Sequence, residues 1–243
     1  MKLIHSRYFP GAKGILRYDV FYLFILLFIF ILFWSVLGLS DIVERGRIQK
    51  FDEYVLLTIR EAEDPSQLRG PEWLRDFMRD ITALGGAPVL TLITLGVIGY
   101  LLLRKSYRSM WLVLVATSSG LGMSLLLKFY FIRPRPSIVP HLMIETTPSF
   151  PSGHSLMSAV IYLTLAALLT RLETSNKVRI YTMSIALLFV FLIGISRVFL
   201  GVHYPTDILG GWTFGVVWAV LCWYIARYLQ KQGAIEEPET ETT

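Results

Sequence analysis

The chain has 243 residues, of which 54% are hydrophobic and 17% charged, and its formal net charge is +5 at pH 7. These proportions argue against an ordinary soluble protein, which carries more charge, and the length fits one domain or at most two. The basic residues lie scattered at the ends of apolar blocks, which argues against nucleic acid as a partner and indicates membrane orientation instead. The single cysteine, Cys222, cannot form a disulfide within the chain, so it does not indicate a redox compartment.

Residues 20–39 form the first apolar block, which follows Lys2, Arg7, Lys13 and Arg17. At a rise of about 1.5 Å per residue, a helix of this length crosses a bilayer. A signal peptide has the same order of charge and apolar residues, but its apolar core is shorter and a small-residue cleavage site follows it. We therefore expect an uncleaved first membrane span.

Residues 40–86 form the longest polar stretch of the chain. Within it, residues 63–70 have the composition of a turn. We expect short amphipathic helices on either side of that turn, lying at the membrane surface. They could shape a lipid entrance or simply pack on the bundle. Two apolar sets at helical spacing predict them: Ile48, Phe51, Val55 and Ile59, then Leu74, Phe77, Met78 and Ile81.

Five further apolar blocks predict membrane spans, over about residues 87–103, 110–128, 153–170, 180–200 and 208–228. Residues 232–243 are acidic and lack apolar periodicity, so we expect a disordered tail. The predicted fold class is all-α, a polytopic membrane protein. Six transmembrane helices would form a bundle, with short interfacial helices between the first two spans. Residues 1–231 would make a single membrane domain.

Six spans would place both termini on the same side of the membrane. The basic residues near span ends gather on that side, while those of the long segment 40–86 alternate with acidic residues and count for less. We therefore predict cytoplasmic termini in a bacterial inner membrane. The segments 40–86, 129–152 and 201–207 would face the periplasm or exterior, or the lumen of a eukaryotic internal membrane.

Three polar clusters fall on this predicted outer side. Consecutive span ends meet in a compact bundle, so we expect three cations, two histidines and one carboxylate to share a pocket. The clusters are Lys128 with Arg135-Pro136, then Pro151-Ser152-Gly153-His154, then Ser196-Arg197 with His203 and Asp207.

The pocket has the composition of a phosphate site. Lys128, Arg135 and Arg197 would bind an anion, because guanidinium groups match phosphate oxygens. Ser152 and Gly153 precede an apolar helix, whose first N–H groups add donors. A single cation at a span end is usually a membrane anchor, and a Ser-Gly pair is usually a cap. The combination on one face is what indicates a phosphoryl group and its charged transition state.

The two histidines could supply acid–base and nucleophilic chemistry. If Pro205 begins the last helix, Asp207 reaches back to His203, fixes its tautomer and makes the other ring nitrogen a better nucleophile. His154 could approach the phosphorus from the opposite side, protonate the leaving oxygen and later deprotonate water. In-line displacement needs these two groups on opposite faces.

These residues and spacings resemble the tripartite signature of the type 2 phosphatidic acid phosphatase superfamily, over roughly residues 85–230. The resemblance implies that His203 forms a phosphohistidine, that Asp207 orients it, and that His154 is the general acid and then the base. Arg133-Pro134 also reads Arg-Pro, but only Arg135 has the family's spacing from Lys128. The phosphate ligands that the resemblance implies are Lys128, Arg135, Ser152, Gly153 and Arg197.

The resemblance also implies that no metal or other cofactor is needed. Around the clusters only Asp207 and Glu145 are acidic, too few for a typical magnesium or two-metal site. His141 and Glu145 match no motif position and are interpreted as loop residues. The expected partners are a lipid phosphate substrate and membrane lipids, without nucleic acid or an obligate protein partner.

The predicted function is therefore hydrolysis of a lipid phosphate or diphosphate. The candidate substrates are undecaprenyl diphosphate, which is our first choice, phosphatidylglycerol phosphate, phosphatidic acid and phosphorylated lipid A. The motifs contact the phosphate and do not choose among the lipids. Alternatives are phosphotransfer to a second lipid and a non-enzymatic lipid transporter or scramblase. Vanadium haloperoxidases share the signature, but they are soluble and larger.

Overall fold

The computed structural model describes residues 48–143 and 145–231, and these fold into helices joined by loops. The predicted all-α class is confirmed for this part of the chain, whereas the predicted first span, 20–39, and the tail, 232–243, lie outside the described residues. The helices are α2 (Gln49–Thr58), α3 (Glu72–Ala83), α4 (Ala87–Leu103), α5 (Tyr107–Phe131), α6 (Gly153–Leu172), α7 (Asn176–Phe199) and α8 (Pro205–Lys231).

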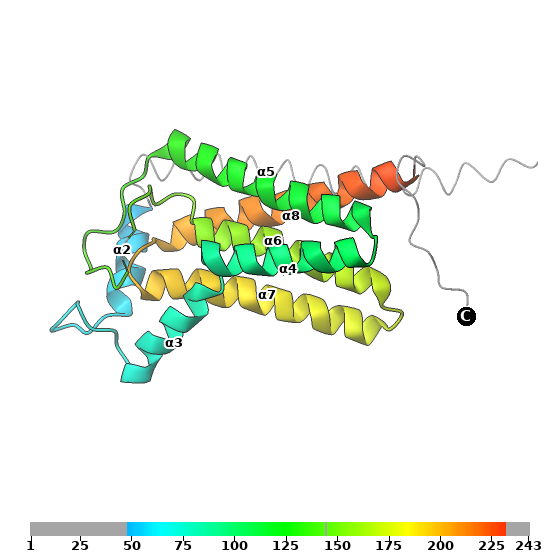
Figure 1. Ribbon diagram of the computed structural model, residues 1–243. Coiled ribbons are helices and arrows are strands. Elements are labelled where there is room, and N and C mark those ends of the chain that lie inside the picture. Colours follow the sequence, from blue (N-terminus) through cyan, green and yellow to red (C-terminus); the bar gives the residue numbers. More distant parts are fainter. Residues whose placement is uncertain (1–47, 144, 232–243) are drawn as a thin grey trace, which may run out of the picture.

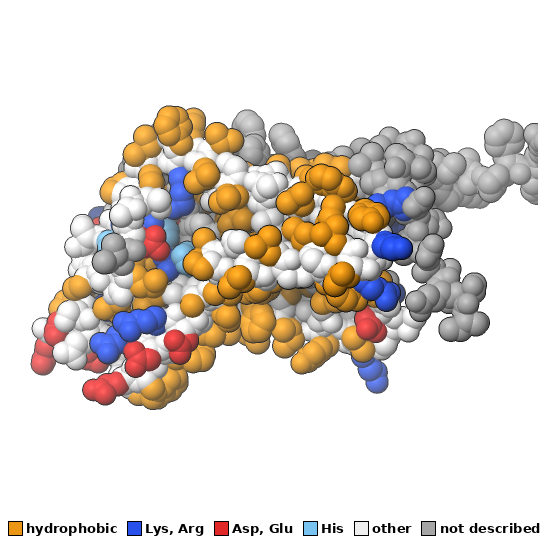
Figure 2. Space-filling view, viewed as in Figure 1, with side chains coloured by type: hydrophobic (Ala, Val, Ile, Leu, Met, Phe, Trp, Pro, Cys, Tyr) orange, Lys and Arg blue, Asp and Glu red, His pale blue; other side chains and the backbone are white. Residues whose placement is uncertain are grey.

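Four of the described helices, α5 to α8, are long and apolar enough to cross a membrane. Helices α3 and α4 pass the same test together, with a bend of 44° between them, so they would count as a fifth, broken span or as a re-entrant loop. The structure therefore accounts for four or five of the six predicted spans. Figure 2 shows apolar side chains over the middle of the bundle and charged side chains at its two ends.

Local chemistry sets the helix ends that matter for the site. The Ser152 side chain caps α6 by accepting a hydrogen bond from the Ser155 N–H at 3.4 Å. Pro205, whose fixed φ suits a first helical position, begins α8 as predicted. Ile132 ends α5 in the left-handed region with φ +40°, and its N–H bonds to the Lys128 carbonyl. This turn directs the following chain across the end of the bundle.

Helix α6 lies at the centre of the bundle and packs against α5, α7 and α8 (Figure 1). The contact between α6 and α8 is a backbone approach at two glycines. A Cβ at Gly211 would lie 2.7 Å from the Ser152 carbonyl oxygen, and one at Gly215 would lie 2.6 Å from the Leu156 carbonyl oxygen. This approach fixes the start of α8 beside the start of α6, which is where the polar clusters lie.

The bend between α3 and α4 also brings the backbone close to its neighbours. A Cβ at Gly85 would lie 2.4 Å from Cγ2 of Ile193 and 3.4 Å from Cδ2 of His154. Helix α3 packs along α7, and α2 lies across the end of α8. The segment that links the predicted first and second spans therefore contacts the end of the bundle that holds His154.

We predict that Gly215→Val destabilises the protein by about 1–3 kcal/mol, because the new side chain must push α6 and α8 apart. Thermal unfolding of the purified protein in detergent measures the effect. Gly99→Val in α4 is the matched control, because no heavy atom lies within 4 Å of a Cβ at that position. Equal unfolding temperatures for the two variants would contradict the close α6–α8 packing.

Candidate active site

The three polar clusters meet at one end of the bundle, where α5 and α7 end and α6 and α8 begin (Figure 1). The Ser152 N–H donates to the Asp207 carbonyl at 3.0 Å, and this bond joins the second cluster to the third. A Cβ at Gly153 would lie 3.6 Å from Cε of Lys128, which joins the first cluster to the second. The predicted convergence of the clusters is therefore present in the structure.

His203 is buried at the centre of this end, between Asp207 and Arg135. Its Nδ1 lies 3.4 Å from Oδ2 of Asp207, and its Nε2 lies 3.2 Å from Nη1 of Arg135. Because a guanidinium only donates, the hydrogen-bond pattern assigns the lone pair to Nε2 and the proton to Nδ1. Burial lowers the pKa of the His203 imidazole to about 4, although Asp207 acts in the opposite direction. At neutral pH the unprotonated Nε2 therefore lies beside a cation.

Asp207 is held by more donors than His203 alone. Its Oδ2 accepts hydrogen bonds from the Tyr204 N–H at 2.9 Å and from the Ser149 hydroxyl. Its Oδ1 accepts from Nη1 of Arg133 at 2.6 Å. The carboxylate is thus fixed in position and charge, as required of a group that sets the tautomer of a histidine.

Arg133 carries the network onward to Asp52 of α2. Its Nη2 lies 2.8 Å from Oδ2 of Asp52, and its guanidinium lies 4.3 Å from the centre of the Tyr204 ring. Asp52 is fully buried and also accepts from the Thr206 N–H at 3.1 Å and from the Thr206 hydroxyl at 2.5 Å. The series Asp52–Arg133–Asp207–His203 thus connects α2 to the first turn of α8.

Lys128 and Arg135 are bound by the loop that follows Arg135 in sequence, and Arg135 also by the turn between α7 and α8. Lys128 Nζ donates to the Thr147 hydroxyl at 2.9 Å and to the Pro148 carbonyl at 2.8 Å. Arg135 Nε donates to the Thr147 carbonyl at 2.8 Å, and its Nη1 donates to the Val202 carbonyl at 2.7 Å. These bonds fix two of the three predicted phosphate ligands around Thr147, and Arg135 lies beside His203.

Arg197, the third cation, is fully buried within α7. Its Nη1 donates to the Thr82 hydroxyl of α3 at 3.1 Å, and its Nη2 pairs with the carboxylate of Glu145. The same carboxylate lies 3.5 Å from Nη2 of Arg135. Glu145 therefore lies between two predicted phosphate ligands, although the sequence had indicated only a loop residue.

Four residues of this site are not predicted from the sequence: Asp52, Arg133, Glu145 and Ser149. The spacing from Lys128 favours Arg135 over Arg133, yet Arg133 is the residue that pairs with Asp207. Asp52 carried a usable signal, since a carboxylate four residues after Ile48 and three before Val55 lies near the apolar face of a predicted helix. Glu145 and Ser149 lie in an irregular loop, where no periodicity marks them.

The residues that the structure describes include no group of three or more histidine, cysteine, aspartate or glutamate side chains placed to hold a metal ion. Positive charge in the site comes instead from Lys128, Arg135 and Arg197. The arrangement combines an unprotonated histidine nitrogen with three cations and a helix N-terminus. Such a combination suits in-line attack on a phosphoryl group.

Comparison with known proteins identifies the family. Residues 108–231 match the model of the PAP2 superfamily. Phosphatidylglycerophosphatase B of Bacillus subtilis is 34% identical over 191 residues, which cover 76% of this chain and 88% of the relative. The undecaprenyl-diphosphatase of Sulfolobus acidocaldarius is 33% identical over 87 residues, 35% of this chain and 38% of the relative.

Two crystal structures are similar to the fold. The transmembrane PAP2-type phosphatidylglycerolphosphate phosphatase of Bacillus subtilis has a TM-score of 0.72 and 29% identity, over 83% of this chain and 96% of that one. Aquifex aeolicus LpxE has a TM-score of 0.55 and 23% identity, over 70% and 93%, and shows the fold alone. The chain belongs to the PAP2 superfamily: it is an integral membrane protein and a lipid phosphate phosphatase, as the motifs predicted.

We predict that Asp52→Asn lowers kcat by about 10- to 100-fold and changes KM by less than about threefold. The substitution removes the charge that shares Arg133 with Asp207, but Asp52 does not contact the three predicted phosphate ligands. Steady-state kinetics in detergent measures the split between kcat and KM, and thermal unfolding checks that the variant is folded.

The exposed Asp80→Asn in α3 is the matched control for this loss of charge, and we expect it to have wild-type kinetics. A wild-type kcat for Asp52→Asn would remove the Asp52–Arg133 pair from the positioning of His203.

Proposed function

We propose that this lipid phosphate phosphatase hydrolyses the phosphate monoester of phosphatidylglycerol phosphate through a phosphohistidine at His203. The substrate is inferred from phosphatidylglycerophosphatase B of Bacillus subtilis, which the chain matches over 88% of that protein's length. The sequence alone favoured undecaprenyl diphosphate, but the undecaprenyl-diphosphatase is matched over only 38% of its length. The observation that carries the mechanism is the position of His203 between Asp207 and Arg135.

In the first step, Nε2 of His203 attacks the phosphorus while the bond from phosphorus to the lipid oxygen breaks. His154 gives its proton to the leaving oxygen. Asp207 accepts the Nδ1 proton as a hydrogen bond and stabilises the positive charge that develops on the ring. The charge on the phosphoryl oxygens is balanced by Lys128, Arg135 and Arg197.

In the second step, a water molecule attacks the phosphorus from the side that the lipid left. His154 accepts the proton of this water, the bond between phosphorus and Nε2 breaks, and inorganic phosphate is released. The Gly153 and His154 N–H groups begin α6 beside Lys128 and have no intrahelical acceptor, so they are available to phosphate oxygens, whereas the Ser155 N–H bonds to Ser152. Ser152 contributes by capping this helix, and Gly153 by leaving room for the phosphate. This mechanism requires no metal ion.

We place the site at the exterior or periplasmic face of a bacterial membrane. Counting residues 20–39 as a span and α3–α4 as a broken one gives the six spans and one membrane domain over residues 1–231. The helix ends opposite the site carry Arg104, Lys105, Arg171 and Arg179. An excess of basic residues favours the cytoplasmic side, and Figure 2 shows Lys and Arg side chains at this end of the bundle. Helices α2 and α3 would then lie at the outer interface.

The test is phosphate release from a panel of lipids by purified protein in detergent. We expect phosphatidylglycerol phosphate to give the highest kcat/KM, ahead of undecaprenyl diphosphate and phosphatidic acid. His203→Ala and His154→Ala should each lower kcat by about 10³-fold or more. His141→Gln is the control, because His141 bonds to the Pro136 carbonyl in the loop and has no proposed role.

Wild-type rates in both histidine variants would refute the mechanism. A higher kcat/KM for another lipid would refute phosphatidylglycerol phosphate as the proposed substrate. Consumption of substrate without release of phosphate, restored by a second lipid, would favour phosphotransfer over hydrolysis.

A further inference from the structure

The carboxylate of Glu145 occupies a position that the reaction itself would require. It pairs with Nη2 of Arg197 and lies 3.5 Å from Nη2 of Arg135. Both guanidinium groups are predicted ligands of the substrate phosphate. A carboxylate and a phosphate both bind guanidinium through two oxygens. Glu145 therefore makes the contacts that the phosphate would make.

The charge balance of the pocket explains why an acidic residue is tolerated there. Arg197 is fully buried, and a buried cation is costly unless an anion pairs with it. Burial alone would raise the pKa of Glu145, but Arg197, and after it Arg135, hold this pKa below its ordinary value. The Glu145 side chain is ionised at neutral pH and is still 20% exposed, so it can turn outward into water.

We propose that Glu145 is an internal anion that competes with the phosphate for Arg197 and Arg135. The proposal rests on the proposed function of this site. A phosphate that reaches the two arginines must displace the carboxylate, because two anions on the same guanidinium groups repel. Glu145 thereby weakens the binding of phosphate. When inorganic phosphate departs, Glu145 replaces it, so the site never leaves Arg197 unpaired.

The test compares Glu145→Gln with wild type, using inorganic phosphate and vanadate as the anions. The amide keeps the shape of the side chain and one acceptor oxygen, but it removes the charge and replaces the second oxygen with an NH2 donor that cannot bond a guanidinium. We expect the inhibition constants of both anions and KM to fall about tenfold, the change expected for one like charge removed. The turnover number should stay equal or fall, because product release becomes slower.

Glu63→Gln is the matched control, since Glu63 lies exposed in the loop between α2 and α3. Weaker or unchanged anion binding in Glu145→Gln would overturn the proposal. If wild-type protein releases phosphate from a lipid and the variant binds vanadate no tighter, only the role of Glu145 fails. If wild-type protein hydrolyses no lipid phosphate in the panel, the proposed function fails, and vanadate affinity of the two proteins still decides the role of Glu145.

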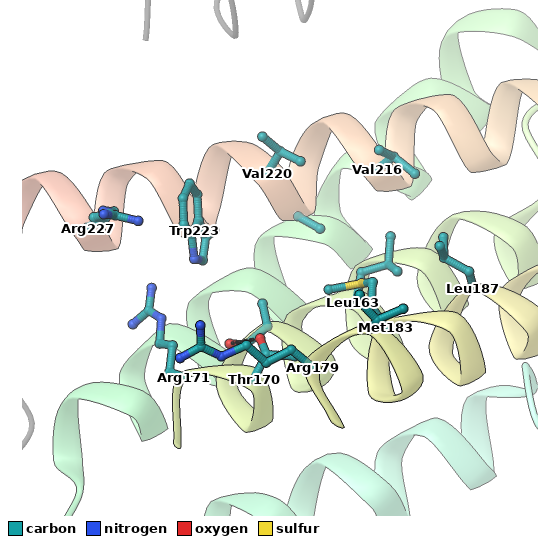
Figure 3. A pocket seen from close by; sticks show the side chains of 13 residues that line it. Leu163, Thr170, Arg171, Arg179, Met183, Leu187, Val216, Val220, Trp223 and Arg227 are labelled. Carbon is teal, nitrogen blue, oxygen red and sulfur yellow. Dashed lines mark hydrogen bonds between the residues drawn. The ribbon is translucent and has the colours of Figure 1, made fainter. Parts of the chain in front are cut away.

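A second proposal comes from the opposite end of the bundle, where a groove of about 900 Å³ lies between α6, α7 and α8 (Figure 3). Its walls are mostly apolar, with Leu163, Met183 and Leu187 toward the middle of the bundle. Arg171, Arg179 and Arg227 lie together at its other end, beside Trp223. The volume is in the range of small-molecule pockets, about 300–1,000 Å³.

The three arginines give the end of the groove a positive charge. Arg179 donates to the backbone carbonyl of Glu173 at 2.7 Å, and the Arg227 guanidinium lies 5.3 Å from the centre of the Trp223 ring. Within residues 48–143 and 145–231, no carboxylate forms an ion pair with any of the three. His154 and Arg171 are separated by most of α6, about 25 Å at 1.5 Å per residue, so this charge is remote from the active site.

We propose that this groove binds an anionic phospholipid of the leaflet opposite the active site. One acyl chain would lie along the apolar wall, and the lipid phosphate would contact Arg171 and Arg227. Basic pockets between membrane helices bind anionic head groups in this way, and tryptophan favours the head-group region. Charge complementarity distinguishes this occupant from a zwitterionic lipid.

Phosphatidylserine is a suitable probe, because this phosphodiester is neither substrate nor product of the proposed reaction. We expect it to raise the thermal unfolding temperature of the purified protein more than phosphatidylcholine with the same acyl chains does. In the double variant Arg171→Gln with Arg227→Gln, the difference in unfolding temperature between the two lipids should fall by at least half. The double variant Arg104→Gln with Lys105→Gln removes the same charge from the same end of the bundle, outside the groove. It should retain the wild-type difference in unfolding temperature between the two lipids.

Native mass spectrometry of the wild-type protein with both lipids provides a measurement that does not depend on the variants. Equal retention of the two lipids, or a double variant that responds as wild type does, would overturn the proposal. Absence of any stabilisation by phosphatidylserine would overturn it as well.

Discussion

The series of buried charges from Asp52 through Arg133 and Asp207 to His203 is the feature on which the rest of the site depends. A buried charge is costly unless a partner neutralises it and hydrogen bonds satisfy its remaining atoms. Here each charge meets that condition: Asp52 and Asp207 share Arg133, and Thr206, Ser149 and backbone N–H groups complete the two carboxylates. Asp207 is therefore fixed before any substrate arrives.

The helix bundle supplies the frame for these charges. The close approach of α6 and α8 at Gly211 and Gly215 places the start of one helix beside the start of the other. As a result, the N–H groups at the start of α6 and the His203–Asp207 pair face the same space. Arg197 lies near the end of α7 and Lys128 near the end of α5, at the same end of the bundle. Each of these helix ends contributes residues to the proposed phosphate site, which therefore lies where the long apolar helices terminate.

The helical spacing and the three motifs were sufficient to predict the all-α class, four apolar spans near their observed places and the convergence of the clusters. Contacts that depend on packing were not predicted. In α2 the buried side chains are Leu56 and the carboxylate of Asp52, which lies next to the predicted apolar position Phe51. The pairing of Arg133 with Asp52 spans 81 residues of sequence, and no local pattern encodes such a contact. The contacts of Glu145 could not be predicted for a similar reason, because the path of an irregular loop determines which residues it meets.

The central claim is that His203 Nε2 forms a covalent bond with phosphorus, and trapping the intermediate tests it most directly. Wild-type and His154→Ala proteins would be mixed with lipid phosphate, denatured quickly in alkali, and analysed by peptide mass spectrometry. The account predicts acid-labile phosphate on the peptide that contains His203. Among protein molecules that have completed the first step, the phosphorylated fraction should be larger in His154→Ala than in wild type, because the second step needs the base. Phosphate on a different residue, or turnover by the wild-type protein with no phosphorylated His203 in either protein, would contradict it.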